Sequence, residues 1–183
     1  MATSQNGFVV LEDNATTGPQ PRLRKWRMAN ADRHFYARDG SAGFLLIHMA
    51  SWFDDEVEVL DREQTWDDWG WAVRPVRGQT SGYSNHASGT ALDLNATKHP
   101  RGVATRQTFS QAEIDKIHRH LHVYDGCIRW GGDYSGTPDG MHFEINKDLA
   151  ACEVVARRFI KQDNKRGMAI LDANPGAKQV ILS

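Results

Sequence analysis

Two short stretches of the chain, residues 91–95 (ALDLN) and 141–145 (MHFEI), alternate apolar and polar side chains. A period of two is typical of a β-strand with one buried face and one polar face. Asp93 lies on the polar side of the first stretch, and His142 and Glu144 lie on that side of the second. If the two strands are neighbours, these side chains project from one face of a sheet. This pairing is the strongest constraint that the sequence places on the fold.

Helical and strand patterns are mixed along the rest of the chain. Apolar residues recur at spacings of three and four over residues 43–60, and Ser110 with Glu113 forms a capping-box sequence before a second helix. Asp148 is suited to cap a later helix. Because strands and helices do not alternate regularly, we predict an α+β fold with a small antiparallel sheet and helices packed on one side. Further short strands are predicted from Trp71 up to Pro75 and over residues 127–130.

The length of 183 residues fits one domain with modest extensions. Residues 1–21 are rich in Thr, Gly, Pro and Gln, and we expect an extended, weakly ordered lead-in. The domain itself is expected over residues 22–166, with a motif core at 71–146. Residues 167–183 are interpreted as a C-terminal tail, either the start of a linker or a packed strap.

Charge and hydropathy exclude two classes of partner. The chain has 22 Lys and Arg against 23 Asp and Glu. Nucleic-acid-binding domains usually show a basic excess, so we expect no nucleic-acid partner despite the basic patch at residues 22–27. No window approaches the ~20 apolar residues of a membrane-spanning helix. The first residues also lack the pattern of a signal peptide. We therefore expect synthesis in a cytoplasm, no membrane partner and a monomeric chain.

The polar residues of the two alternating strands belong to a candidate metal site. His86 lies in a Gly/Ser loop just before the first strand, and it joins Asp93 and His142 in a set of two imidazoles and one carboxylate. Three protein ligands leave a fourth position for water, as in catalytic zinc sites. We predict one Zn²⁺ on these residues. Asp139, in a turn three residues before His142, is the preferred general base, and Glu144 is the competing candidate.

Several other conspicuous residues have ordinary interpretations. His118 and His122 share a helix face, but no third ligand lies nearby, and we expect them to interact with the helix C-terminus. Four of the six Trp lie between Trp52 and Trp71. We expect these rings to pack in the core, with an aromatic wall for a sugar or peptide ligand as the alternative. The two cysteines, Cys127 and Cys152, are interpreted as small buried thiols, with a single bridge as the other possibility.

Taken together, the motifs resemble those of the zinc D-alanyl-D-alanine carboxypeptidase and L-alanyl-D-glutamate endopeptidase superfamily. That group includes vancomycin-resistance dipeptidases and the peptidase domains of phage endolysins. The pattern S-x-H-x(6)-D appears as Ser84, His86 and Asp93, and the acidic residue three positions before a His appears as Asp139 and His142. An Arg-Pro element and an aromatic–Gly–Gly–Asp element also match, as Val73, Arg74 and Pro75 and as Trp130, Gly131, Gly132 and Asp133.

The resemblance implies a hedgehog/D-Ala-D-Ala-peptidase-like fold and assigns roles to individual residues. It implies the same three zinc ligands, with Asp139 as the catalytic base. Arg74 would stabilise the oxyanion, with Arg77 as the alternative, and Ser84 would contact the substrate. Three residues are interpreted equally as turn and packing residues or as walls of the substrate cleft: Trp130, Asp133 and Tyr134.

The implied activity is that of a zinc metallopeptidase acting on the peptide part of bacterial peptidoglycan, with the stem peptide as its partner. Many relatives carry Glu as the base, whereas Asp139 is similar to the base of some phage L-alanyl-D-glutamate peptidases. We therefore expect a phage endolysin, made in the host cytoplasm and acting at the cell wall after release. The bond stays open among L-Ala–D-Glu, D-Ala–D-Ala and a cross-link to a diamino acid. A non-catalytic, zinc-containing cell-wall-binding module of the same fold is the alternative.

Overall fold

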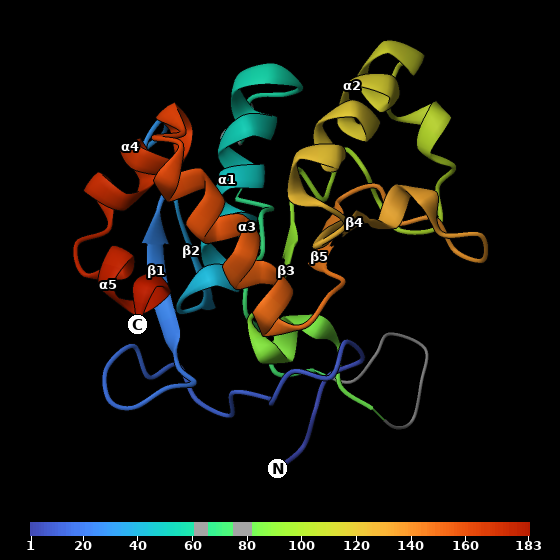
Figure 1. Cartoon of the computed structure of the whole chain (residues 1–183). Helices are drawn as coiled ribbons and strands as arrows, with labels where there is room; N and C mark the ends of the chain where they lie inside the picture. The colour runs from blue at the N-terminus through green and yellow to red at the C-terminus, as the bar shows by residue number, and fades with distance from the viewer. Residues whose placement is uncertain (61–65, 75–81) are drawn as a thin grey trace.

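The computed structural model describes residues 1–60, 66–74 and 82–183, and within them the chain has the α+β architecture that the sequence predicts (Figure 1). Strands β1 (Leu23–Arg27) and β2 (His34–Arg38) form an antiparallel hairpin. A second antiparallel sheet has the strand order β3-β5-β4 and contains β3 (Ala91–Asp93), β4 (Ile128–Trp130) and β5 (His142–Ile145). The α-helices are α1 (Ser41–Glu56), α2 (Gln111–Leu121), α3 (Leu149–Lys161), α4 (Lys165–Ala173) and α5 (Ala177–Leu182).

Helix α1 forms the centre of the core. All of its residues from Ser41 to Phe53 are buried, and it contacts β1, β2, β5, α3 and α4. A helix that is buried on every side must lie between other layers, and Figure 1 shows α1 in the middle of the molecule. The helix ends at Glu56, four residues earlier than predicted, and beyond it the Leu60 amide donates to the Asp54 carboxylate at 2.8 Å.

The three-stranded sheet confirms the predicted pairing of the two alternating stretches. Its central strand β5 pairs with β3 so that Asp93 lies opposite His142, and Leu92 lies opposite Phe143. Leu92 and Phe143 are buried, and the Phe143 ring packs against Phe53 of α1 at 5.8 Å. The apolar face therefore anchors the sheet to the core, and the opposite face carries the polar residues.

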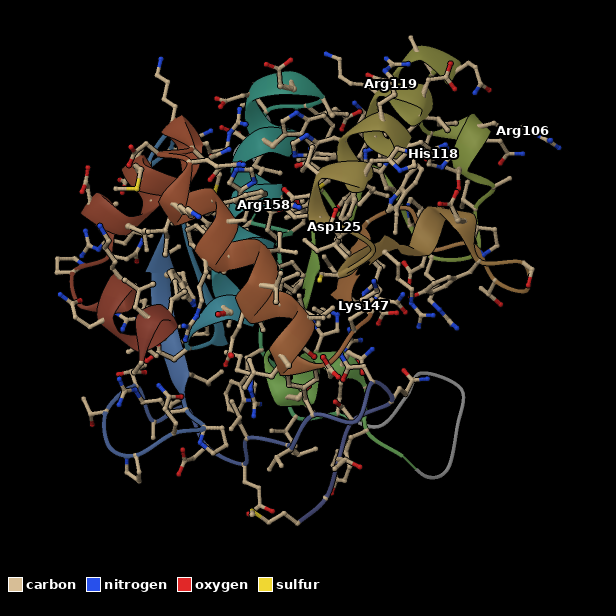
Figure 2. The ribbon with its side chains drawn as sticks, viewed as in Figure 1. Arg106, His118, Arg119, Asp125, Lys147 and Arg158 are labelled. Atoms are coloured by element: carbon tan, nitrogen blue, oxygen red, sulfur yellow. The ribbon has the colours of Figure 1, made fainter. Side chains whose placement is uncertain are left out.

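Caps and ion pairs fix the helices that frame this sheet. The predicted capping box at the start of α2 is confirmed, with both Ser110 and Glu113 engaged. Asp148 caps α3, as predicted, by accepting from the Ala151 amide at 2.9 Å. Farther along α3, Arg158 donates to the Asp125 carboxylate at 2.5 Å, which ties this helix to the turn that follows α2 (Figure 2).

Several segments differ from the sequence-based expectations. Residues 71–74 do not form a strand, and Trp69 instead makes an isolated bridge to Asp93. Of the two interpretations of residues 167–183, the packed segment agrees with the structure and the linker does not, because α4 and α5 fold back and bury Ile170, Leu171 and Ile181.

Within the expected lead-in of residues 1–21, residues 4–11 pack against the domain, whereas residues 12–21 are exposed. The side chains of Phe8, Val10 and Leu11 are buried. Cys127 and Cys152 are both free and buried. In the part of the chain that the structure describes, no helix has the length and apolar character needed to cross a membrane.

Helices α1 and α2 meet at two neighbouring histidines, the buried His48 and the half-buried His120. His48 on α1 contacts the Tyr124 hydroxyl through Nδ1 at 2.8 Å and the Asn164 side-chain oxygen through Nε2 at 3.1 Å. His120 stacks on the Trp52 ring at 3.8 Å. Burial lowers the pKa of His48 to about 4, although the Asn164 hydrogen bond opposes this shift. Burial, assisted by the nearby His48, lowers the pKa of His120 to about 3.

We therefore predict that this chain loses stability when it is acidified below pH 6.5. The unfolded histidines titrate near their ordinary pKa, so the unfolded state binds more protons than the folded state as pH falls from 6.5 towards 4. The stabilisation is complete above pH 6.5, and its loss approaches about 1.4 kcal/mol per pH unit for each histidine. Denaturant unfolding in excess chelator at pH 7 and pH 5 measures this slope. His120→Phe should reduce the slope, and an unchanged slope would contradict the assignment.

Candidate metal centre

Strand pairing and a short 3-10 helix position the three predicted metal ligands. The antiparallel register of β3 and β5 places Asp93 beside His142. His86 lies on the 3-10 helix η1 (Asn85–Ser88), whose N-cap is Ser84. The helix ends at Gly89, with φ +66. A Cβ on Gly89 would also lie 2.6 Å from the Arg38 amide nitrogen. Glycine therefore permits both the left-handed turn and the close approach of this loop to β2.

The ligand atoms of the three residues converge. His86 Nε2 lies 3.2 Å from Asp93 Oδ1 and 3.3 Å from His142 Nδ1, and His142 Nδ1 lies 2.8 Å from Asp93 Oδ1. Four ligands at tetrahedral zinc distances of about 2.0–2.1 Å are separated from one another by roughly 3.3 Å. Within the part of the chain that the structure describes, this is the one group of three or more His, Cys, Asp or Glu side chains close enough together to share a metal ion.

Hydrogen bonds on the far side of each imidazole determine which nitrogen faces the centre. His86 Nδ1 donates to the Gly70 carbonyl at 2.6 Å, and His142 Nε2 donates to Glu144 Oε2 at 3.0 Å. Both rings therefore present an unprotonated nitrogen to Asp93 when they are neutral. Two nitrogen lone pairs and a carboxylate oxygen at such short distances repel one another unless a cation lies between them. The donor set and its outer hydrogen bonds thus fit a bound zinc ion.

The charges of the surrounding groups favour a cation at the same place. Burial tends to raise the pKa of Asp93, but His86 and His142 hold it well below its usual range. Burial likewise tends to lower the pKa of His142, but hydrogen bonds to Asp93 and Glu144 raise it to about 10. Two carboxylates thus stabilise positive charge between them, and a metal ion would replace the proton on His142.

Glu144 is occupied by several donors. Its Oε2 atom accepts from His142 and from Asn85, and its Oε1 atom accepts from Arg129 and from the Tyr134 hydroxyl at 2.6 Å. Burial alone would raise the pKa of Glu144, but these partners lower it to about 2. A permanently ionised and fully engaged carboxylate is suited to orient His142 rather than to exchange protons with a substrate.

Asp139 lies close to His142 through a turn of the backbone. Its amide donates to the Gly131 carbonyl at 2.8 Å, and its carbonyl accepts from the His142 amide at 3.1 Å. A Cβ on Gly131 would lie 3.0 Å from the Asp139 Cβ and 3.1 Å from the His142 Cβ. The absence of a side chain at Gly131 therefore allows this turn to fold against the ligand strand.

A cavity of about 270 Å³ contains most of the predicted site residues. Asp93, His142, Asp139, Ser84 and Tyr134 line it, together with Arg74, whose Nη2 lies 3.4 Å from Asp93 Oδ2. A larger hollow of about 400 Å³ near the N-terminus contains none of these residues. The full lining of the 270 Å³ cavity comprises Gln5, Arg74, Ser84, Asp93, Arg101, Arg129, Tyr134, Thr137, Asp139, Met141, His142 and Glu144.

Two predicted substrate residues lie elsewhere. Trp130 is 1% exposed and donates to the Gly140 carbonyl at 2.7 Å, so it packs in the core and does not face a substrate. Asp133 does not line the cavity, and it pairs with His118 on α2 at 2.8 Å. For Trp130 and Asp133, the structure therefore favours the packing and turn interpretation over a role as walls of the substrate cleft. Pro75 lies outside the described residues, and so does Arg77, which was the alternative candidate for stabilising the oxyanion.

Sequence reasoning missed several residues around the cavity. Arg101 Nε lies 3.5 Å from Asp139 Oδ2, and no sequence pattern singled it out. Arg129 lies opposite Glu144 in the pairing of β4 with β5. The predicted strand at residues 127–130 was the sequence signal that could have placed Arg129 on the polar face.

The expected core packing of the tryptophans holds for Trp52 but is wrong for Trp66 and Trp69, which are 74% and 57% exposed. Trp69 and Asp93 exchange two backbone hydrogen bonds, at 2.9 and 2.8 Å. Residues paired in this way project to the same side of a sheet, which places the Trp69 ring on the metal side.

Comparison with known families agrees with this geometry. Residues 77–145 match the model of a family described as D-alanyl-D-alanine carboxypeptidase. The matched segment contains His86, Asp93, Asp139 and His142, and it covers less than half of the chain. No curated protein and no solved structure matches the chain. The family match supports a peptidase.

We predict that alanine at His86, Asp93 or His142 weakens zinc binding by more than about 100-fold, because loss of outer partners alone typically costs about 10- to 100-fold. Competition with a chromophoric chelator measures the affinity, and elemental analysis should give one zinc per wild-type chain. His122→Ala, which changes an exposed histidine outside the cluster, serves as the control. Wild-type affinity in any of the three ligand variants would contradict the assignment.

Proposed function

We propose that this protein is a zinc peptidase that hydrolyses the peptide part of bacterial peptidoglycan, as an L-Ala–D-Glu endopeptidase or a D-Ala–D-Ala carboxypeptidase. The observation that carries the proposal is the convergence of His86, Asp93 and His142, of which Asp93 and His142 line a cavity shared with Asp139 and Arg74. The family match to residues 77–145 also supports peptide hydrolysis.

Each cavity residue has a role that its chemistry suits. When bound, the zinc ion supplies a Lewis acid and makes water a stronger nucleophile near neutral pH. Asp139 removes the proton of the attacking water and later transfers it to the leaving amine. The Arg74 guanidinium, half-buried beside Asp93, stabilises the negative charge that develops on the carbonyl oxygen. Ser84 and Tyr134 offer hydroxyl groups for orienting the peptide.

The charge of the cavity suits an anionic peptide. Arg74, Arg101 and Arg129 line it, and each contacts a carboxylate of the site. A divalent cation adds two further positive charges, so the cavity as a whole attracts carboxylates. In both candidate bonds the carbon next to the scissile nitrogen carries a free carboxylate, and this shared group fits the arginines.

The biological setting is part of the proposal. The aspartate at position 139 favours the type of peptidase found in phage endolysins, which act on the cell wall after release from the host cytoplasm. A non-catalytic wall-binding module of the same fold would bind zinc and peptidoglycan without releasing products. The experiment that follows separates these two functions.

We predict that Asp139→Asn lowers the rate of peptidoglycan hydrolysis by about 10²- to 10⁴-fold, because a general base typically contributes this much. The variant should retain one zinc per chain, since Asp139 is not a ligand. New amino groups measure the rate, and mass spectrometry of the released muropeptides identifies the bond. Asp172→Asn, an exposed change on α4, is the matched control.

If the wild-type chain binds zinc but releases no amino groups from any peptidoglycan type, the peptidase proposal fails and the binding module replaces it. If Asp139→Asn is as active as wild type, another residue is the base.

The exposed ring on the metal side gives a separate prediction. Trp69→Ala should raise KM for muropeptides up to about tenfold, because aromatic contacts contribute on the order of 1 kcal/mol, while kcat changes little. Trp66→Ala is the comparison, since the Trp66 ring lies against Arg33 at 4.5 Å. Steady-state kinetics on a defined muropeptide measures both constants. Equal KM values for Trp69→Ala and wild type would exclude a substrate contact.

A further inference from the structure

The first residues of the chain lie along the loop that carries His86. We call residues 4–11 the N-terminal strap. The Gln5 amide donates to the Tyr83 carbonyl at 3.1 Å, and the Leu11 amide donates to the Ala87 carbonyl at 2.9 Å. Arg38 joins both segments by donating to the Val9 and Ser88 carbonyls, each at 3.1 Å. The strap therefore braces the loop from outside, although it lies more than 60 residues before the matched family segment.

Asn6 makes side-chain and backbone hydrogen bonds to this loop and to the ends of two strands. Its side-chain amide donates to Thr90 Oγ1 and to the Ile145 carbonyl, both at 2.8 Å. These bonds anchor Asn6 between the start of β3 and the end of β5. Its backbone N–H then donates to Asn85 Oδ1 at 3.0 Å.

The Asn6 N–H determines how the Asn85 amide is oriented. Because a backbone N–H needs an acceptor, the oxygen of Asn85 faces the strap and its amino group faces the site. That amino group donates to Glu144 Oε2, the same atom that accepts from His142 Nε2. A continuous chain of hydrogen bonds therefore runs from Asn6 through Asn85 and Glu144 to the metal ligand His142.

We propose that the N-terminal strap supports the metal centre. Asn6 is a positioning residue that fixes the tautomer and orientation of His142 through Asn85 and Glu144. The strap also supplies Gln5 to the cavity wall. This inference rests on the metal centre of the proposed function and does not depend on the reaction. Outer hydrogen-bond partners of metal ligands typically contribute about 10- to 100-fold to metal affinity.

The test compares zinc affinities of the full-length chain, measured by chelator competition without substrate. Asn85→Ala should weaken zinc binding by about 10- to 100-fold. Asn6→Ala should weaken it about three- to tenfold. This variant loses the side-chain bonds to Thr90 and Ile145 that hold residue 6 in place, but its backbone N–H can still donate to Asn85. The double variant should bind zinc no more weakly than Asn85→Ala alone, because the two residues act in one chain of bonds. Asn14→Ala, at an exposed position outside the strap, is the matched control.

A second readout separates positioning from a general loss of stability. The visible absorption of the Co²⁺-loaded chain reports ligand geometry, and Asn6→Ala should change it whereas Asn14→Ala should not. If Asn6→Ala does not fold, Asn6→Asp keeps the side-chain size and replaces the donor to Thr90 and Ile145 with a charged carboxylate oxygen, and it should weaken zinc binding at least as much. Additive effects of the two single variants, or wild-type affinity and spectrum in a folded Asn6 variant, would overturn the proposal.

The outcomes distinguish this inference from the proposed function. A wild-type chain that binds zinc but hydrolyses nothing refutes the peptidase, while the coupled affinities still support the strap. An active chain whose Asn6 variants bind zinc normally refutes the strap alone. A wild-type chain that binds no zinc refutes both.

Discussion

The antiparallel pairing of Asp93 with His142 is the constraint on which the rest of the site depends. Opposed residues in neighbouring strands lie close enough for their side chains to share a ligand. The same register turns Leu92 and Phe143 into the core, so the core and the candidate metal centre depend on one set of backbone hydrogen bonds. A shift of one residue would exchange the polar and apolar faces and destroy both together.

Buried charge is the second physical condition of this site. Asp93 and Glu144 are almost inaccessible to water, and an isolated buried carboxylate would be costly. Each is compensated by cationic or hydrogen-bonding partners, and His142 lies between the two. The arrangement stabilises positive charge at His142, whether a proton or a metal ion supplies it. This is the electrostatic reason why the cluster suits a divalent cation.

Support for the ligands comes from segments outside the matched family region. The Gly70 carbonyl orients His86, and Asn6 orients Asn85. Helix α1, also before residue 77, provides the surface on which the sheet rests. The folded unit that makes the site is therefore larger than the segment that carries its motifs.

The sequence by itself determined which residues form the candidate site. Alternation in two short strands, the spacing of His86 from Asp93 and of Asp139 from His142, and the capping pattern at Ser110 are local properties that a chain expresses wherever it folds. Tertiary structure decided what depends on distant partners. The Gly70 carbonyl and the Glu144 carboxylate determined which imidazole nitrogen faces the centre, and packing buried Trp130 while a single bridge left Trp69 exposed. The tertiary structure also decided that the first residues and the C-terminal helices pack on the domain, because the apolar surface that they cover exists only after the core has formed.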